Sequence, residues 1–267
     1  MAPRSEGSGL RARLVVAVPA VAFALFIVIE GGLVFTLGLI ALGVVCLHEL
    51  FAMLSDTEPV RLAGFLGLFG LLLGAHYGRQ YDMVLVAVAL VPVVFVLTLA
   101  QVRGGAVGMA VTLLGVWWIG LGFAHAVLLR QLPHGSAIVI DVLVGTFVGD
   151  TGAYVGGRMF GQRPLAPSIS PNKTVEGLVI GIVSAVAAVW LAHLYEKPWL
   201  TGAHALLLGL GVALAAPVGD LFESYIKREA KTKDTGRLFG AHGGALDRLD
   251  AVLFTAVIGY YLWHAMV

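Results

Sequence analysis

The chain has 267 residues, of which 59% are hydrophobic and 12% charged, and its mean hydropathy is +0.93. Soluble domains carry about 25% charged residues, so this composition excludes an ordinary soluble domain and indicates several membrane-spanning helices. The net charge of +1 provides no basic field for nucleic acid, and the single cysteine, Cys46, excludes an internal disulfide and a metal site made of several thiolates.

Apolar runs divide the chain into candidate helices. Residues 1–13 form a polar lead, and no small-residue cleavage site precedes the next apolar run, so we expect a first membrane segment there rather than a signal peptide. Nine runs of spanning or near-spanning length follow, at 14–29, 31–50, 62–78, 83–100, 106–128, 136–157, 175–194, 201–219 and 249–266. The first two are short and closely joined. The sequence therefore predicts an all-α polytopic membrane protein with about nine spans, within a range of eight to ten.

The distribution of Lys and Arg predicts the orientation of these spans. With nine spans and a cytoplasmic N-terminus, 14 of the 17 basic residues fall in inside segments, and Arg79, Arg130 and Lys197 fall outside. The positive-inside rule favours this arrangement strongly. It places the two long polar loops, 158–174 and 220–248, together on the cytoplasmic side.

Charge is concentrated near the end of the chain. Residues 220–250 hold 12 of the 33 Asp, Glu, Lys and Arg residues. A charged residue costs at least ~2.5–3.5 kcal/mol at the centre of a membrane helix, so such a cluster indicates a functional site. If the apolar run at 201–219 continues as a helix, its next turns carry polar groups on one face at i, i+4, i+7 and i+11, namely Asp220, Ser224, Lys227 and Lys231.

The rest of this segment supplies a flexible turn and two more carboxylates. Lys233, Asp234 and Gly236 are expected to end the helix. Backbone N–H groups near His242, Gly243 and Gly244 could approach phosphate oxygens closely. Asp247 and Asp250 open the last helix at i and i+3 and can point the same way. The alternative for Asp250 is a capping role, because acids in a first turn suit the helix dipole.

A second polar group precedes the run at 175–194. Asp150, Tyr154 and Arg158 form one helical stripe, for which the alternative is a structural polar pair that closes the bundle. After it, Ser170 to Gly177 reads as a loop that leads into a helix, with Thr174 or Ser170 near the N-cap. Lys173 beside a helix N-terminus suits an anion, and the alternative is a plain loop and cap.

This mixture of side chains fits one kind of chemistry. Carboxylates from two helices can hold Mg²⁺, which prefers oxygen ligands, and nearby cations can neutralise a transferring phosphoryl group. The sequence contains no P-loop and no nucleophile elbow, and its eight histidines are scattered without a zinc-binding pattern. The residues therefore indicate phosphoryl or nucleotidyl transfer at a membrane surface.

The same residues resemble a known family. The segment Ser224-x-x-Lys227-Arg228-x4-Lys233-Asp234-x7-His242-Gly243-Gly244-x2-Asp247-Arg248-x-Asp250 is similar to the signature of the phosphatidate cytidylyltransferase family, also called CDP-diacylglycerol synthase. Asp150-x-Gly152-Ala153-Tyr154, Ser170-Pro171-x-Lys173-Thr174-x-Glu176-Gly177 and Gly219-Asp220-Leu221-x-Glu223-Ser224 are similar too. The specific matches cover about 150–250, and length and hydropathy extend the likeness over the whole chain.

The resemblance implies an activity and its partners. Members join CMP from CTP to phosphatidic acid and release pyrophosphate, and they are membrane-embedded, commonly homodimeric and dependent on Mg²⁺, with K⁺ as a possible second ion. We therefore expect one membrane-embedded domain, 1–267, with N-terminal helices at 14–130 and the catalytic helices and cytoplasmic loops at 136–267. The expected location is a bacterial cytoplasmic membrane, with the site facing the cytoplasm and lipid bilayer around it.

The resemblance also implies roles for individual residues. The metal is expected on Asp220 and Asp247. The expected catalytic set is Asp220, Asp247, Lys227, Lys233 and Arg248. The expected substrate-binding set is Asp150, Ser170, Lys173, Thr174, Glu176, Ser224, Arg228, Asp234, His242, Gly243, Gly244 and Asp250. Asp234 and Asp250 could instead hold basic side chains in place, and His242 could be a turn residue.

Two other functions are weighed against this one. A CTP-dependent polyprenol or phytol kinase would share metal-bound CTP but use another lipid acceptor. An anion transporter would place its polar groups near the middle of the membrane, often in helices related by an inverted repeat. The chain shows no repeat, and its charge gathers at one predicted edge.

Overall fold

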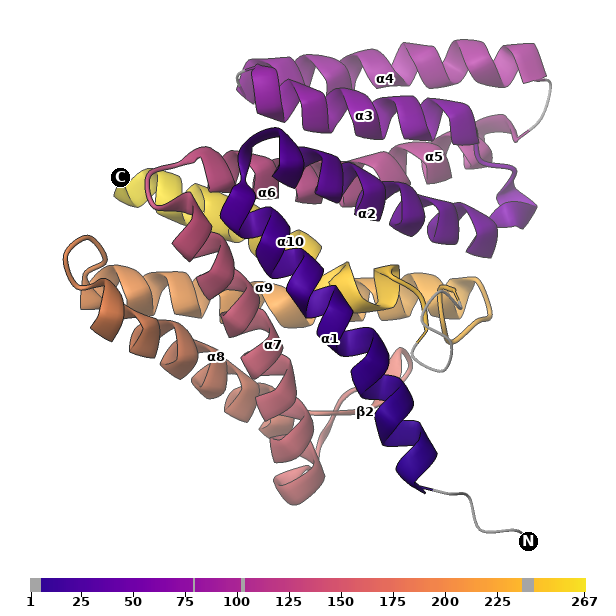
Figure 1. The fold of residues 1–267 in the computed structure, drawn as a ribbon. Helices are drawn as coiled ribbons and strands as arrows, with labels where there is room; N and C mark the ends of the chain where they lie inside the picture. The colour runs from indigo at the N-terminus through magenta and orange to yellow at the C-terminus, as the bar shows by residue number, and fades with distance from the viewer. Residues whose placement is uncertain (1–5, 79, 102–103, 237–242) are drawn as a thin grey trace, which may run out of the picture.

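The computed structural model describes residues 6–78, 80–101, 104–236 and 243–267, which form a helical bundle with one small hairpin (Figure 1). The helices are α1 (Glu6–Glu30), α2 (Gly32–Met53), α3 (Arg61–Tyr77), α4 (Gln80–Gln101), α5 (Gly105–Gly115), α6 (Leu121–Gln131), α7 (Gly135–Phe160), α8 (Val175–Glu196), α9 (Gly202–Glu229) and α10 (Leu246–Met266). A short 3-10 helix, η1 (Ser55–Thr57), precedes α3, and a π-helical turn, η2 (Val116–Gly120), joins α5 to α6. The strands β1 (Pro164–Ala166) and β2 (Ser170–Thr174) lie between α7 and α8.

The predicted apolar runs correspond to helices throughout, with the fifth run spread over α5, η2 and α6. Within the described part of the chain, seven segments are long and apolar enough to cross a membrane. Two shorter apolar helices, Val18–Glu30 and Arg61–Tyr77, accompany them. The prediction of an all-α polytopic membrane protein is therefore confirmed. The number of spans and the cytoplasmic N-terminus stay predictions.

Helices α7 and α8 pack closely because glycines lie at their contact. A Cβ atom at Gly177 would lie 2.7 Å from the carbonyl oxygen of Ala153, and one at Gly181 would lie 2.9 Å from that of Gly149. Close approach of backbones is a main source of helix association in lipid, where burial of apolar surface from water contributes little. The closely packed α7–α8 pair therefore forms one side of the site described below.

Helix α2 connects the two parts of the bundle. In Figure 1 it lies between the α3–α4 pair and the α9–α10 pair, and it contacts both α3 and α10. Its side chains Leu47, Leu50 and Phe51 are fully buried in the core. Residues of the first part of the chain thus reach the helices that carry the charged segment.

Helix α9 continues through Pro217 into the charged segment and ends at Glu229. Asp220, Ser224 and Lys227 are therefore helical, as predicted. Lys231 was expected on the same face, but it lies beyond the helix with a φ angle of +54°, so that part of the prediction is wrong. The helix ends two residues earlier than the expected face requires.

Candidate active site

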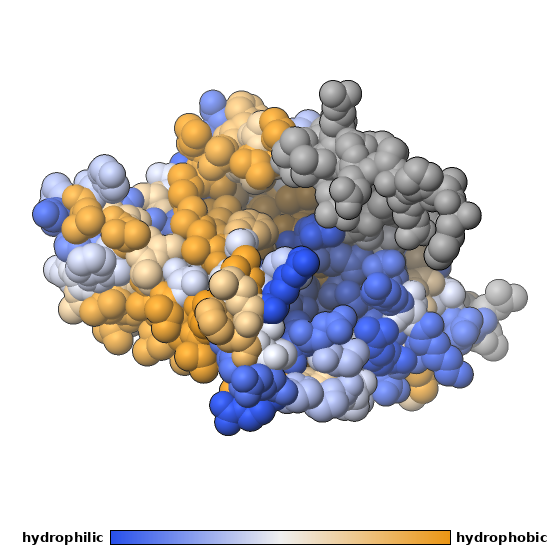
Figure 2. All heavy atoms as spheres, turned by 90° about the horizontal axis from the view of Figure 1, so that it is seen from below, coloured by the Kyte–Doolittle hydropathy of each residue, from blue (hydrophilic) through white to orange (hydrophobic). Residues whose placement is uncertain are grey.

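A cavity of about 520 Å³ opens between α7, the hairpin, α8 and α9. Its lining includes Asp150, Tyr154 and Arg158 of α7, Ser170 to Thr174 apart from Pro171, and Asp220 of α9. Figure 2 shows hydrophilic residues gathered along one side of a hollow on one face of the molecule, with apolar residues along its opposite side. The two polar groups that the sequence singled out, at 150–177 and 220–250, thus meet at one place.

The cavity contains charges of both signs. Lys173 of β2 forms an ion pair with Asp220 of α9, and both side chains are partly buried. The Arg158 guanidinium lies 3.4 Å from the Tyr154 hydroxyl and donates to it. The predicted stripe of Asp150, Tyr154 and Arg158 therefore faces the cavity as a unit.

Three carboxylates come together beside the cavity. Asp220 and Glu223 of α9 and Asp250 of α10 each offer an oxygen, and these oxygens lie within 4.8 Å of one another. Glu223 and Asp250 are 2% and 8% exposed, and Oε1 of Glu223 is buried without a hydrogen-bond partner in the described structure. An all-oxygen donor set with one acceptor still unused fits Mg²⁺.

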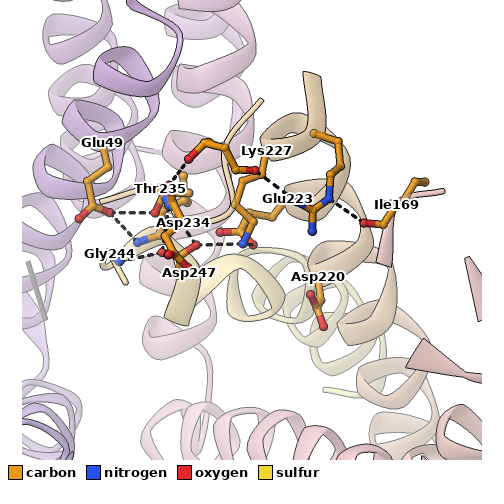
Figure 3. A network of polar contacts seen from close by, with 12 residues as sticks. Glu49, Ile169, Asp220, Glu223, Lys227, Asp234, Thr235, Gly244 and Asp247 are labelled. Atoms are coloured by element: carbon orange, nitrogen blue, oxygen red, sulfur yellow. Dashed lines mark hydrogen bonds and ion pairs between the residues drawn. The ribbon is translucent and has the colours of Figure 1, made fainter. Parts of the chain in front are cut away.

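Asp247 belongs to a neighbouring network, drawn in Figure 3. Nζ of Lys227 lies 2.6 Å from Oε2 of Glu223 and 2.9 Å from Oδ1 of Asp247. The backbone N–H of Gly244 donates to Oδ2 of Asp247 at 2.7 Å, and that of Thr235 donates to both carboxylate oxygens at 3.2 and 3.1 Å. Asp247 therefore already has four donor contacts from three residues. The metal assignment of Asp220 and Asp247 stays a prediction.

The hairpin is fixed at its base by Glu176. This carboxylate accepts from the backbone N–H groups of Gln162 and Arg163 at 3.0 and 3.1 Å, and from Nε of Arg163 at 2.9 Å. It therefore faces the base of the hairpin, and it is not part of the cavity lining. Thr174 accepts from the N–H of Gly177 at 3.1 Å, which confirms the predicted N-cap of α8.

The loop that the sequence predicted at 170–177 includes the strand β2, which pairs antiparallel with β1. Ser170 opens this strand and lines the cavity. Arg228 of α9 donates through Nε to the carbonyl oxygen of Ile169 at 3.0 Å. The turn of the hairpin is thereby tied to the helix that carries Asp220.

The remaining predicted residues lie around these groups. Ser224 is buried on α9, whereas Lys233, Asp234 and Arg248 are exposed. Gly243 adopts a φ angle of +81°, a conformation that favours glycine, and Gly244 is buried beside it. His242 lies outside the described residues, so its predicted role stays a prediction.

Sequence reasoning did not select two of the buried carboxylates, one within the acidic cluster and one that contacts α10. Glu223 appeared in the family pattern but was assigned no role, although it shares the acidic cluster with Asp220. Glu49 of α2 was passed over within an apolar run, yet it reaches the first turn of α10. The signal was available, because an ionisable residue inside a membrane segment is by default a candidate functional group.

The fold and the cavity define an integral membrane enzyme that combines carboxylates and cations at one end of its helices. Comparison with known proteins gives the family. The chain belongs to the cytidylyltransferase family, which it matches over residues 11–266. It is therefore a nucleotidyltransferase.

Several relatives are phosphatidate cytidylyltransferases, in agreement with this assignment. The chain is 34% identical over 264 residues to a phosphatidate cytidylyltransferase of Bacillus subtilis (strain 168), covering 95% of this chain and 97% of the relative. It is 31% identical over 252 residues to one from Staphylococcus aureus (strain COL), covering 92% and 95%. One from Helicobacter pylori is 42% identical over 140 residues, which cover 52% and 51%.

Proposed function

We propose that this protein transfers CMP from CTP to phosphatidic acid, forming CDP-diacylglycerol and pyrophosphate. The similarity to phosphatidate cytidylyltransferases over nearly the whole chain supports this function. The observation that carries it in the molecule is the position of Lys173. This cation pairs with Asp220 at the edge of the carboxylate cluster, in a cavity bounded by membrane helices. Such a site can receive a lipid phosphate and a nucleotide triphosphate together.

Asp220, Glu223 and Asp250 would hold the divalent metal, with Asp247 of the predicted pair beside them. A bound Mg²⁺ would supply charge neutralisation for the triphosphate oxygens of CTP. A second ion, K⁺, is part of the proposal through the family resemblance alone. All three clustered ligand groups are carboxylates, so the site offers oxygen ligands.

The chain's own cations position the two anions. Arg158 and Lys173 line the cavity and would offset charge on the phosphate groups. Lys227 lies between Glu223 and Asp247, and its positive charge offsets the repulsion between these two carboxylates. A phosphatidate oxygen forms a bond to the α-phosphorus of CTP, and the bond between that phosphorus and pyrophosphate breaks. The second phosphate pKa is about 6, so the nucleophile is already ionised and requires no strong base.

The proposal includes a site on the cytoplasmic side of a bacterial cytoplasmic membrane. The excess of Lys and Arg in the predicted inside segments supports this orientation, and CTP is a cytosolic substrate. A homodimer is proposed from the family resemblance. Mass measurement of the purified protein in detergent or nanodiscs tests it, and a monomer that is fully active would contradict it.

Radiolabelled CTP tests the proposed reaction directly. Purified protein is incubated with phosphatidate, Mg²⁺ and CTP labelled at either the α or the γ position, and the lipid is extracted. Label from the α position is expected in lipid and is expected to be lost with a chelator. Label that enters lipid only from the γ position would identify a kinase instead. Parallel reactions with the other three nucleoside triphosphates measure base selectivity.

A further inference from the structure

Glu49 of α2 is a buried carboxylate that reaches the first turn of α10. Its side chain is 6% exposed. Oε1 accepts from the backbone N–H of Ala245 at 3.1 Å, and Oε2 accepts from that of Leu246 at 2.9 Å. The first N–H groups of a helix have no partner within the helix, and an anion there also suits the helix dipole. Glu49 therefore supplies the N-terminal cap of α10 from another part of the chain.

The same carboxylate contacts the segment that follows α9. The Thr235 hydroxyl donates to Oε2 of Glu49 at 3.4 Å. A Cβ atom at Gly236 would lie 2.5 Å from Oε1, and one at Gly244 would collide with the carboxylate. Both glycines thus leave room for Glu49. Residues 235–236 and 244–246 therefore meet at the carboxylate of Glu49.

Asp247 contacts the same two backbone segments, at Thr235 and at Gly244. Thr235 and Gly244 donate their N–H groups to Asp247, while the Thr235 hydroxyl and the N–H groups after Gly244 point to Glu49. Figure 3 shows Glu49 beside Thr235 at one side of this network, and Gly244 in contact with Asp247. Displacement of Glu49 would therefore move groups that contact Asp247 directly.

We propose that Glu49 is a positioning residue for cytidylyl transfer. It sets the first turn of α10, and so places Asp247 beside Lys227 and Asp250 beside Asp220. It does not line the cavity, and it acts through α10 rather than on substrate. The inference rests on the proposed function and assigns part of it to the N-terminal helices. A misplacement of about 1 Å in a catalytic arrangement can cost on the order of 100-fold in rate.

The test compares Glu49→Gln with His48→Gln, an exposed neighbour on the same helix. Glutamine keeps the volume of Glu49 but removes the charge and replaces one acceptor oxygen with a donor. Three quantities are measured in each variant and in wild type: kcat and KM for CTP, hydrogen exchange at Gly244, Ala245 and Leu246, and the melting temperature. Exchange reports how well the N–H groups of the α10 first turn are protected by their hydrogen bonds, without reference to activity.

For Glu49→Gln we expect kcat to fall at least about tenfold with a smaller change in KM. Exchange should rise at 244–246 and not in α3 or α4, and the melting temperature should fall by less than about 10 °C. His48→Gln should behave as wild type. A kcat within twofold of wild type would overturn the proposal, and so would a loss of activity with unchanged exchange at 244–246. A uniform rise in exchange through all helices would also overturn it, because that marks a general structural role.

The two proposals fail in different ways. If wild-type protein transfers no CMP to phosphatidate, the proposed function is wrong. The anchoring of α10 by Glu49 is then decided by the exchange at 244–246 alone, where no difference between Glu49→Gln and wild type rejects it.

Discussion

Lys173 of the hairpin forms an ion pair with Asp220 of α9, and Asp220 is also one of the three clustered carboxylates. One carboxylate therefore serves two neighbours that both carry positive charge, the lysine and the proposed divalent ion. If Asp220 held the proposed ion, its ion pair with Lys173 would weaken, and this cation would become available for a substrate phosphate. Binding of the metal and of the substrate would then be linked through a single side chain.

Replacement of Lys173 by Met separates these two effects. The variant should need less Mg²⁺ for half-maximal activity, because Asp220 no longer has a competing cation. Its kcat should nevertheless fall by roughly 100-fold, by analogy with the loss of one preorganised charged donor. Mg²⁺ titration of the labelled-CTP assay measures both values, with Lys197→Met at an exposed position as the control. An unchanged Mg²⁺ requirement would show that the lysine does not compete at Asp220.

The identity of the metal ligands can be decided by the same titration. Asp220→Asn and Asp250→Asn should lower kcat by about 100-fold or more and raise the Mg²⁺ concentration required. Asp247→Asn should lower kcat without that rise, because its carboxylate is engaged by Lys227 and two backbone N–H groups. Asp56→Asn, at an exposed position, serves as the control.

An equal rise in the Mg²⁺ requirement for Asp247→Asn and Asp220→Asn would favour the pair predicted from the sequence. In that case Asp250 would act by holding neighbouring groups in place. The comparison therefore distinguishes two ligand sets that share Asp220.

The close contact of α7 and α8 predicts a sensitive glycine. Gly177→Ala places a Cβ atom 2.7 Å from the carbonyl oxygen of Ala153 and 3.0 Å from Cα of Gly157, and neither backbone atom can rotate away. The variant should lose about 1–3 kcal/mol of stability. It should also lose activity, because the hairpin that lines the cavity ends at Thr174, directly before this end of α8.

Gly74→Ala is the matched control for that substitution. A Cβ atom at this α3 position meets nothing closer than 3.8 Å. Alanine is favoured over glycine inside a helix by about 0.5–1 kcal/mol, so this variant should be as stable as wild type or more so. Thermal unfolding in detergent measures both variants. Equal behaviour would contradict the packing argument.

Glu176 is expected to act through the hairpin. Glu176→Gln should weaken the contacts to Gln162 and Arg163 and so loosen the hairpin that carries Lys173. The KM should then rise for whichever of CTP and phosphatidate binds beside Lys173. Arg163→Gln removes only the ion pair, whose arginine side chain is 77% exposed, and should have a smaller effect. Steady-state kinetics for CTP and phosphatidate measure both variants. A larger effect from Arg163→Gln would mean that the ion pair, not the backbone contacts, fixes the hairpin.

The helices could be predicted because hydrocarbon leaves the backbone few alternatives. A segment that spans lipid must satisfy its own N–H and C=O groups, so apolar length alone indicates α-helix. The last helix was predicted to open near Asp247, and it begins at Leu246. The hairpin was not predicted, because its strands contain Pro164 and Pro171 and depend on contacts from Glu176.

The sequence predicted most of the side chains that form the site, but not which of them contact one another. Helical periodicity places Asp247 and Asp250 on similar faces, and only tertiary packing decides that Asp250 joins Asp220 while Asp247 turns to Lys227. Glu49 is a stronger case. Its partner Ala245 lies 196 residues further along the chain, and no local pattern links two positions so distant in sequence.

Helix α9 carries Asp220 near the far end of an apolar segment that is long enough to cross a membrane. Its 28 residues extend about 42 Å at 1.5 Å per residue, and Asp220 lies about 27 Å from Gly202 along that axis. The hydrocarbon layer is about 30 Å thick, so a helix that crosses it from Gly202 without strong tilt would bring Asp220 close to the lipid headgroups. A bilayer with much longer or shorter acyl chains would then change the depth of Asp220 relative to the lipid phosphate, unless the helix tilts.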